Sequence, residues 1–400
     1  MAQDIRFEIL PGIYPSDMST DGSVLVGNDI NFETVRWTRQ SGVVNLGRGT
    51  QSLGVGAGTP DCSDDGTSVS ASILTSDGTL ITQGIWTEGV GWTEMMPPTP
   101  PDGGVIDFAL GSAWGLSGDG QHVVGLYWRP GHFDTGGAHA SIASMPGALT
   151  DLGSSGGNSR ANHANFDGSV VVGWDERPDG VWQPAVWENG LLNILSPSDA
   201  FSSADYVNPS GTMVGGNTYR PIFNYQQATV WHKNGSQWDE QVLGVLPGTV
   251  GPFGFATVHD SNEDDSILVG YNSFTPTSPS TGFIWTAEDG MIDVKDYLID
   301  HGITVPTEMI VLDLTAVSDD GTIMAGIGVS ALDGFSPIGF RISPACPADM
   351  NNDFSLNFLD ISVFLGAFGD HEPLADFNAD GNFNFLDVSA FLSSFSAGCP

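Results

Sequence analysis

The chain has 400 residues, of which 48 are Asp or Glu and only 11 are Lys or Arg, so its formal net charge is −37. This shortage of basic side chains excludes a nucleic-acid partner, because binding phosphates requires clustered Lys and Arg. The residues are 40% hydrophobic and include 53 Gly and 24 Pro, which predicts a folded protein of many short strands joined by turns. No apolar run is long enough to insert into a membrane.

A short sequence motif recurs along the chain, first at residues 21–27. It consists of Asp-Gly followed by an apolar run that ends with Gly. Asp-Gly between apolar runs predicts a tight hairpin, because Gly adopts the positive φ that the turn requires. Each copy continues with a short strand, in five copies ending in a Trp that we expect in the core, and then a last strand. Four strands per repeat predict propeller blades. The copies are marked by Asp21, Asp65, Asp119, Asp167, Ser210, Asp264 and Asp320, and the core Trp residues are Trp37, Trp86, Trp187, Trp231 and Trp285.

The two ends of this array complement each other. The seventh copy lacks its fourth strand after residues 339–342, whereas the chain begins with an unpaired strand at 6–12. If the first strand completes the seventh blade, no sheet edge is left open. We therefore predict an all-β fold, a seven-bladed β-propeller over residues 1–342, followed by a small α-helical domain at 343–400. An open sandwich or a solenoid is the alternative.

On these repeats the chain resembles the HAF-type extracellular repeat family and, less closely, the propeller repeats of periplasmic Tol-system proteins. The resemblance covers about four-fifths of the chain and implies an extracellular protein. It supplies no catalytic residues. We find no zinc-binding His spacing, nucleophile elbow, phosphate loop or dinucleotide fingerprint either.

One position in the first strand of each blade, four residues before the turn, approaches the expected central channel. If these side chains point inward, their carboxylates and one histidine could hold a metal or perform acid–base chemistry. Burial between blades is the favoured interpretation, because structural networks also collect such residues. The set consists of Asp17, Asp61, Gly115, His163, Tyr206, Asp260 and Ala316.

Arg129, Arg177 and Arg220 each precede a Pro at equivalent places in blades three to five. Arginine forks bind carboxylates or sulfates, and aromatic faces suit sugar rings, so these loops are a candidate groove for an anionic polysaccharide. Ion pairing with nearby acids such as Asp134, Asp175 or Glu176 is the favoured alternative. The aromatic residues around the arginines are Tyr127, Trp128, Phe133, Trp174, Trp182, Tyr219, Phe223 and Tyr225.

After residue 344 the sequence contains two similar twelve-residue motifs, whose first residues are 27 positions apart. Each has oxygen-bearing side chains at positions 1, 3, 5, 9 and 12, which is the donor pattern that Ca²⁺ requires, and each leads into a helix. Two such loops in tandem predict two calcium sites. The predicted residues are Asp349, Asn351, Asp353, Ser355, Asn357 and Asp360 in the first loop, and Asp376, Asn378, Asp380, Asn382, Asn384 and Asp387 in the second.

Residues 346–400 resemble a dockerin domain of the type ending in Gly-Cys that is found on secreted planctomycete proteins. Phe354 replaces the expected glycine, so we expect the first site to be weaker. The resemblance implies that the two residues before each last ligand help to bind a cohesin partner. Packing between the domain's own helices is the alternative for these apolar pairs, which are Phe358 with Leu359 and Phe385 with Leu386.

Cys346 and Cys399 bracket this C-terminal segment, so we predict a disulfide between them and an oxidising compartment. The expected location is extracellular or on the cell surface, with a signal peptide already removed. Cys62 lies in an apolar strand pattern and is expected to be a buried free thiol.

Together these features predict a secreted, non-catalytic protein. Its propeller would bind a glycan or protein, and its dockerin-like module would anchor it, in a calcium-dependent way, to a cohesin-like partner or to a second copy. Two alternatives stay open. One is an extracellular enzyme that degrades polysaccharides, and the other is a self-assembling subunit of a surface layer or filament.

Overall fold

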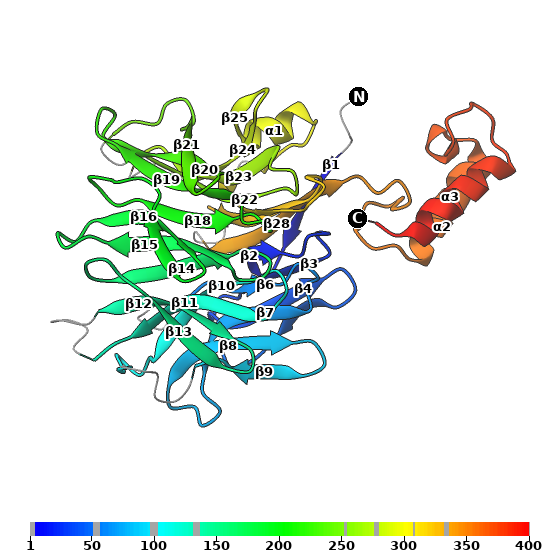
Figure 1. The fold of residues 1–400 in the computed structure, drawn as a ribbon. Helices are drawn as coiled ribbons and strands as arrows, with labels where there is room; N and C mark the ends of the chain where they lie inside the picture. Colours follow the sequence, from blue (N-terminus) through cyan, green and yellow to red (C-terminus); the bar gives the residue numbers. More distant parts are fainter. Residues whose placement is uncertain are drawn as a thin grey trace. The chain divides into compact units, whose positions relative to one another are not determined.

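The computed structural model describes residues 5–50, 57–96, 103–130, 137–251, 254–275, 280–306, 309–331 and 336–399. Within these ranges the strands form seven four-stranded sheets, most of them built from four consecutive strands (Figure 1). The protein is therefore a seven-bladed β-propeller followed by a helical segment, and the open sandwich and the solenoid are excluded. By contacts the chain divides into two compact units, Ile9–Arg341 and Met1–Glu8 with Ile342–Pro400.

Blades one to four follow the chain in order. Blade one contains β2 (Tyr14–Met18), β3 (Val24–Asn28), β4 (Thr34–Thr38) and β5 (Gly42–Asn45). Blade two contains β6 (Asp61–Cys62), β7 (Ser68–Leu74), β8 (Ile81–Thr87) and β9 (Gly91–Glu94). Blade three contains β10 (Gly111–Leu116), β11 (His122–Trp128), β12 (Ala138–Ser144) and β13 (Ala148–Gly153). Blade four contains β14 (Ser159–Ala164), β15 (Val170–Glu176), β16 (Trp182–Glu188) and β17 (Leu191–Ile194).

The last blade combines both ends of the repeat array, as predicted. Blade five contains β18 (Ser203–Val207), β19 (Met213–Arg220), β20 (Tyr225–Asn234) and β21 (Gln237–Gly244). Blade six contains β22 (Phe255–Ser261), β23 (Ile267–Ser273), β24 (Ser280–Thr286) and β25 (Gly290–Asp293). In blade seven the N-terminal strand is paired beside the last one, in the order β1 (Ile5–Leu10), β28 (Pro337–Pro344), β27 (Met324–Ser330) and β26 (Met309–Val317) (Figure 1).

The Asp-Gly turns between the first two strands of the blades have the expected geometry. In blade one, Gly22 has a φ of 67°, and the Asp21 carboxylate accepts hydrogen bonds from the Ser19 hydroxyl and the Ser23 backbone N–H. The Ser19 hydroxyl in turn accepts the backbone N–H of Val24. These bonds satisfy the turn internally and fix where the second strand begins.

Backbone hydrogen bonds between neighbouring blades run around the ring at the same turns. Thr20 donates its N–H to Asp64 O, Asp64 donates to Gly118 O, and Glu263 donates to Asp319 O. Asp319 then donates to Thr20 O at 2.8 Å, which joins the seventh blade to the first. The ring of blades is therefore closed.

The periodic tryptophans belong to the core. Trp37, Trp187 and Trp231 are buried, and Trp86 and Trp285 are partly buried against the clusters between blades. Cys62 is a buried free thiol, as expected.

In the described ranges the structure has four helical segments in addition to the sheets. The helix α1 (Val294–Asp300) follows β25. Asp293 caps α1 by accepting the N–H of Lys295. The C-terminal unit contains α2 (Phe358–Asp370), the 3₁₀ helix η1 (Pro373–Ala375) and α3 (Phe385–Ala397). None of the helices in the described ranges is both long and apolar enough to span a bilayer.

Candidate functional site

The two oxygen-rich loops of the C-terminal unit, 349–360 and 376–387, follow the same backbone path. Each turns through the left-handed region at its fourth and sixth positions. The φ angles there are 56° at Asn352, 64° at Phe354, 56° at Ala379 and 77° at Gly381. Phe354 thus adopts the conformation that glycine adopts freely, at a cost in backbone strain.

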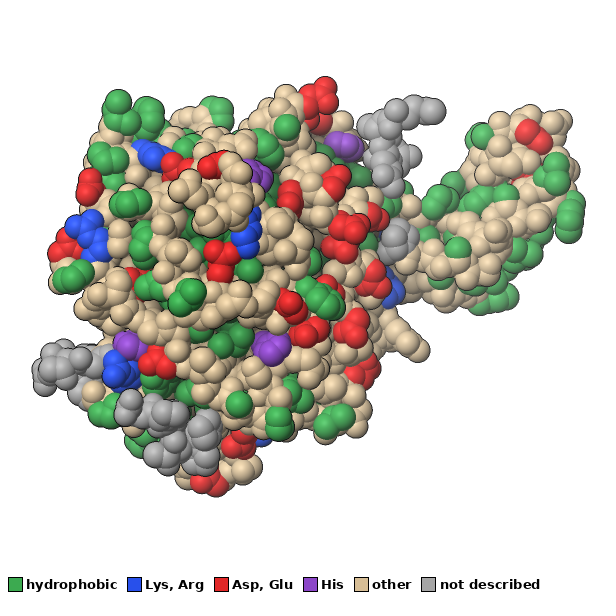
Figure 2. Space-filling model, viewed as in Figure 1, with side chains coloured by type: hydrophobic (Ala, Val, Ile, Leu, Met, Phe, Trp, Pro, Cys, Tyr) green, Lys and Arg blue, Asp and Glu red, His purple; other side chains and the backbone are tan. Residues whose placement is uncertain are grey.

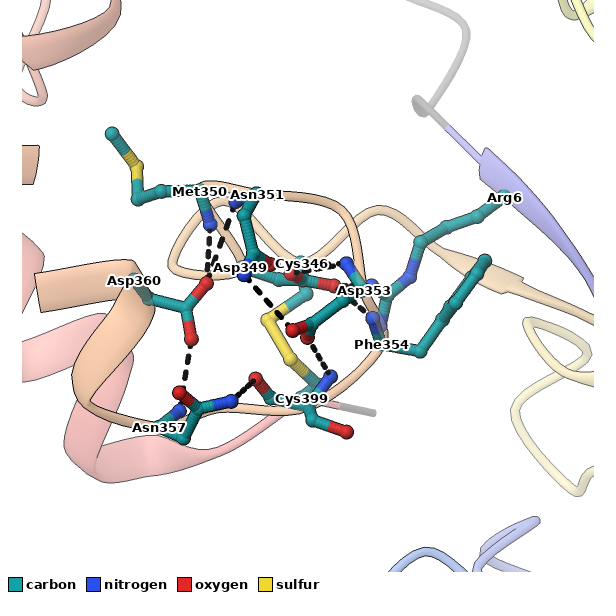
Figure 3. The surroundings of a disulfide bond; sticks show 11 residues. Arg6, Cys346, Asp349, Met350, Asn351, Asp353, Phe354, Asn357, Asp360 and Cys399 are labelled. Carbon is teal, nitrogen blue, oxygen red and sulfur yellow. Dashed lines mark hydrogen bonds and ion pairs between the residues drawn. A yellow bond between two sulfur atoms is a disulfide. The ribbon is translucent and has the colours of Figure 1, made fainter. Parts of the chain in front are cut away.

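Their side-chain hydrogen bonds are also matched. In the first loop the Asp349 carboxylate accepts the N–H groups of Asp353 at 3.1 Å and Phe354 at 2.9 Å (Figure 3). The corresponding bonds of the second loop join Asp376 to the N–H groups of Asp380 at 3.0 Å and Gly381 at 2.9 Å. The repeated sequence therefore produces a repeated loop structure.

The last carboxylate of each loop is completely buried and begins a helix. Asp360 accepts the N–H of Asn357 at 2.8 Å, and Asp387 accepts the N–H of Asn384 at 2.9 Å. Both pairs form capping boxes at the starts of α2 and α3. Hydrogen bonds from the backbone, first from Asn384, hold the pKa of Asp387 below its usual range.

The first loop differs from the second by one ion pair that the sequence did not reveal. The Arg6 guanidinium lies 2.6 Å from Asp349 Oδ2, and this carboxylate is buried (Figure 3). Arg6 also lies 5.1 Å from the centre of the Phe354 ring. Asp376, the equivalent residue of the second loop, pairs with no basic side chain in the described ranges.

Within the described part of the chain, no group of three or more His, Cys, Asp or Glu side chains is arranged to hold a metal ion. The two loops would depend on a mixed set, in which Asn and Ser oxygens alternate with carboxylates. Asn351 and Asp353 lie side by side, with Asn351 Nδ2 donating to Asp353 Oδ2 at 2.9 Å, and Asn378 repeats this bond to Asp380 at 3.2 Å. The donor chemistry of the loops fits Ca²⁺.

The predicted disulfide is confirmed. Cys346 and Cys399 are bonded, with their Cα atoms 5.3 Å apart and a sequence separation of 53. The bond ties the two ends of the C-terminal unit together beside the first loop (Figure 3).

The apolar pairs that begin α2 and α3 face solvent. Phe358 is 74% exposed and Leu359 57%, and their counterparts Phe385 and Leu386 are 77% and 59% exposed. The helices pack through other residues, above all Phe364 and Phe391, whose rings stack 4.1 Å apart. Figure 2 shows hydrophobic side chains at the surface of this unit. Packing between the helices therefore does not account for the two pairs.

The three arginines of the expected groove lie in contacts with neighbouring side chains. Arg177 pairs with Asp179 at 2.7 Å and Arg220 with Glu240 at 2.8 Å, while Arg129 Nη1 contacts His139 Nε2 at 3.0 Å.

The acids that pair with Arg177 and Arg220 are not the ones that the sequence suggested. Asp175 instead accepts a hydrogen bond from Ser155, and Glu176 accepts one from Asn158.

Several aromatic residues of the expected groove contact neighbouring side chains of the propeller, each in a different way. Trp174 is buried and stacks on Trp182 with 4.2 Å between ring centres, Trp128 packs against an apolar cluster, and Tyr219 donates its hydroxyl to Asn224. Phe133 and Asp134 lie outside the described residues.

A cavity of about 330 Å³ is lined by the first strands of all seven blades or the residues preceding them. Five members of the channel set predicted from the sequence line it: Asp17, Asp61, His163, Tyr206 and Asp260. A second ring of residues, one position earlier, was not predicted. Six of the seven strands carry a β-bulge there, and a bulge re-aims side chains. That ring consists of Ser16, Pro60, Trp114, Asn162, Asp205, His259 and Thr315.

Four members of the channel set also bind the next blade. Each accepts one backbone N–H from its neighbour's first strand. The bonds join Asp17 to Cys62 N at 2.8 Å, Asp61 to Leu116 N at 2.8 Å, His163 to Val207 N at 3.3 Å and Asp260 to Val317 N at 2.7 Å. The set therefore both faces the cavity and holds the blades together.

Burial dominates the electrostatics of these groups. It raises the pKa values of Asp17, Asp61 and Asp260, and the nearby Asp61 carboxyl adds to the rise at Asp17. Burial lowers the pKa of His163, whose Nε2 lies 3.6 Å from Asp61 Oδ2. These shifts favour the neutral form of each group.

The Asp64 carboxyl, in the turn between β6 and β7, predicts that the stability of the propeller depends on pH. Burial, followed by the charge of Asp319, raises the pKa of Asp64 to about 6. The stability that this group contributes is therefore present at low pH and is lost as the pH rises through about 6. Asp64→Asn should raise the free energy of unfolding of the propeller by about 1 kcal/mol above pH ~7, allowing for solvent screening, and by less below pH ~5. Urea unfolding followed by Trp fluorescence measures this difference.

Asp77→Asn is the matched control. Hydrogen bonds from the Thr75 and Thr79 side chains lower the pKa of Asp77 to about 2, so this substitution should not stabilise the protein at neutral pH. A loss of stability in Asp64→Asn at both pH values would contradict the assignment.

No protein-family model matches the chain, and no curated protein is significantly similar to it. Among solved structures, an oligogalacturonate lyase in complex with manganese superposes with a TM-score of 0.52 at 14% identity, covering 86% of this chain and 91% of that one. TolB from Acinetobacter baumannii gives a TM-score of 0.44 at 11% identity, covering 68% of this chain and 63% of that one. At 14% identity the likeness to the oligogalacturonate lyase structure shows the fold alone, which is that of a seven-bladed β-propeller.

Proposed function

We propose that the protein is a secreted, non-catalytic binding protein whose C-terminal unit docks onto a partner in a calcium-dependent way. The observation that carries this proposal is the matched pair of loops, each of which ends in an exposed Phe-Leu pair. More specifically, the C-terminal unit is proposed to be a dockerin-like domain. The propeller, with its HAF-like repeats, is proposed to be the ligand-binding domain. The disulfide supports an extracellular location, because such bonds persist in oxidising compartments.

Calcium would be held by the oxygen side chains at positions 1, 3, 5, 9 and 12 of each loop, with a backbone carbonyl at position 7. The ion would neutralise carboxylates that otherwise repel one another and would fix the start of each helix. The first site should be the weaker one for two reasons. Arg6 already pairs with Asp349, which opposes a second positive charge, and Phe354 stores strain in the loop.

The docking face consists of Phe358, Leu359, Phe385 and Leu386. Exposed apolar patches of this kind mark interaction sites when they are not covered by the rest of the protein. Because the same pair stands at the start of both helices, a partner would meet equivalent contacts in either of two orientations. The proposed partner is a cohesin-like domain or a second copy of this chain.

Sedimentation of the full chain with and without Ca²⁺, together with binding to a panel of cohesin domains, tests the proposal. Phe358→Ala with Leu359→Ala, or Phe385→Ala with Leu386→Ala, should each leave most of the binding. The fourfold variant should lose at least about thirtyfold in affinity, as expected when apolar anchors are removed. Absence of any calcium-dependent association, or unchanged binding by the fourfold variant, would contradict it.

An enzymatic role is the second candidate, because carboxyl groups and His163 line one cavity in the propeller. Turnover of acidic polysaccharides by the full chain would favour it. An anionic polysaccharide along Arg129, Arg177 and Arg220 is a further candidate ligand, and it would have to displace the ion pairs of Arg177 and Arg220.

A further inference from the structure

Among the described residues that line the cavity at the centre of the blades, Arg160 is the only Arg or Lys, and it lies beside one face of Trp114. The guanidinium carbon of Arg160 lies 3.7 Å from the centre of the Trp114 ring and 5.5 Å from that of Trp174. Both Arg160 and Trp114 line the cavity. Stacking on an aromatic face leaves the edges of a guanidinium available for hydrogen bonds.

A chain of hydrogen bonds fixes the orientation of this arginine. Arg160 Nε donates to Asn162 Oδ1 at 2.7 Å, and Asn162 Nδ2 donates to Ala204 O at 2.9 Å and to Asp205 Oδ1 at 3.1 Å. Asp205 is itself held by the hydroxyl of Thr257, at 2.6 Å from its Oδ2. The guanidinium is therefore preorganised before any ligand arrives.

Arg160 forms no ion pair with any carboxylate of the described residues, and its two terminal nitrogens form no hydrogen bond there. This distinguishes it from Arg177 and Arg220, which are paired on the propeller. In agreement, burial lowers the pKa of Arg160 to about 10. Asp205, the acid whose charge acts on Arg160, already accepts bonds from Asn162 and Thr257. A half-buried guanidinium fork that is fixed in orientation and has no ion pair among the described residues is suited to binding a carboxylate in a bidentate way.

Three carboxyl groups are among the other polar groups that line the cavity. Asp17, Asp61 and Asp260 come from three other blades, and the size of the cavity, about 330 Å³, lies at the lower end of the range of small-molecule sites. Burial raises the pKa values of these three carboxyls, which lessens their repulsion of an anion. Their oxygens can accept hydrogen bonds from hydroxyl groups.

We propose that this cavity binds a small hydroxylated carboxylic acid of the size of one sugar acid. Arg160 binds its carboxylate, and the carboxyl groups of Asp17, Asp61 and Asp260 bind its hydroxyl groups. The site is independent of the C-terminal unit, so it can hold whether or not that unit docks onto a partner.

Calorimetric titration of the full chain with D-glucuronate and with D-glucose tests this assignment, because the two sugars differ only in the carboxylate. The acid should bind at least about tenfold more tightly than the neutral sugar. Arg160→Gln should remove most of this preference, whereas the control Arg177→Gln, outside the cavity, should keep it. Near-UV circular dichroism checks that each variant is folded.

Arg160→Lys decides the outcome if the Gln variant does not fold. Lysine keeps the charge but lacks the bidentate fork, so the preference for the acid should fall by several-fold without vanishing. Three results would overturn the proposal: no binding of D-glucuronate or D-galacturonate at about 10 mM, equal binding of acid and neutral sugar, or an unchanged preference in both Arg160 variants.

Discussion

Replacing Asp360 by alanine is expected to unfold most of the C-terminal unit while the propeller stays folded. The buried carboxylate accepts the N–H of Met350 at 2.9 Å and the N–H of Asn357 at 2.8 Å. Leaving two such donors without a partner costs about 2–5 kcal/mol, and the loss of the helix cap is part of this. The same substitution removes the last predicted calcium ligand of the first loop.

The distribution of aromatic residues makes this result easy to measure. All 11 Trp residues lie between positions 37 and 285, so Trp fluorescence reports on the propeller alone, whereas helical ellipticity reports mainly on the C-terminal unit. Asp360→Ala should lower the urea midpoint of the helical signal and leave the fluorescence midpoint unchanged. Asp296→Ala, an acid in the first turn of α1, is the control. Coincident shifts of both signals would show that the effect is not local to the loop.

Removing the disulfide is the second change with a large expected effect. The bond closes a loop between Cys346 and Cys399 with a sequence separation of 53, which contributes roughly 4 kcal/mol in the chain-entropy model. The double variant Cys346→Ser with Cys399→Ser should therefore be folded in this unit only when Ca²⁺ is present. The helical signal, measured in Ca²⁺ and in chelator, gives this dependence.

Cys62→Ser is the matched control, because this buried thiol belongs to the propeller and forms no disulfide. It should lower the fluorescence midpoint and leave the helical signal unchanged. If the double variant were as stable in chelator as the unmodified protein, the disulfide would not stabilise the unit.

The fold was predictable because each local signal agreed with the repeat. The turn at Asp21-Gly22 requires a positive φ that Gly supplies, and the recurrence of this turn fixed the number of blades. The sequence also located the first strand in the last sheet and the Cys346–Cys399 bond. The turns depend on residues that are close in sequence. The placement of the first strand followed from counting the strands of each repeat, and the disulfide from the positions of the three cysteines.

The sequence predicted only some of the residues that line the cavity. Asp17 and His163 were found by counting back from the turn, but Trp114 and Arg160 were missed. A β-bulge inserts a residue without changing the apolar pattern of a strand, so alternation alone cannot place the preceding side chain. Arg6 was missed for another reason, since its contact with Asp349 joins positions 343 residues apart.

The acidic composition also has a structural explanation. Aspartates recur in turns, in the loops 349–360 and 376–387, and in the channel set, where they bind backbone N–H groups. The few arginines are mostly paired. Arg160, which forms no ion pair among the described residues, and the two loops rich in carboxylates are therefore the features for which we propose ligands.

Calorimetric titration of the full chain with Ca²⁺, followed by a thermal scan with and without chelator, tests the central claim most directly. We predict two binding events of unequal affinity, with the weaker one strengthened by Phe354→Gly, which relieves the strain in the first loop. Chelation should abolish the melting transition of the C-terminal unit and leave that of the propeller in place. No heat on titration, with melting that is insensitive to chelator, would contradict the assignment of a calcium-dependent docking module.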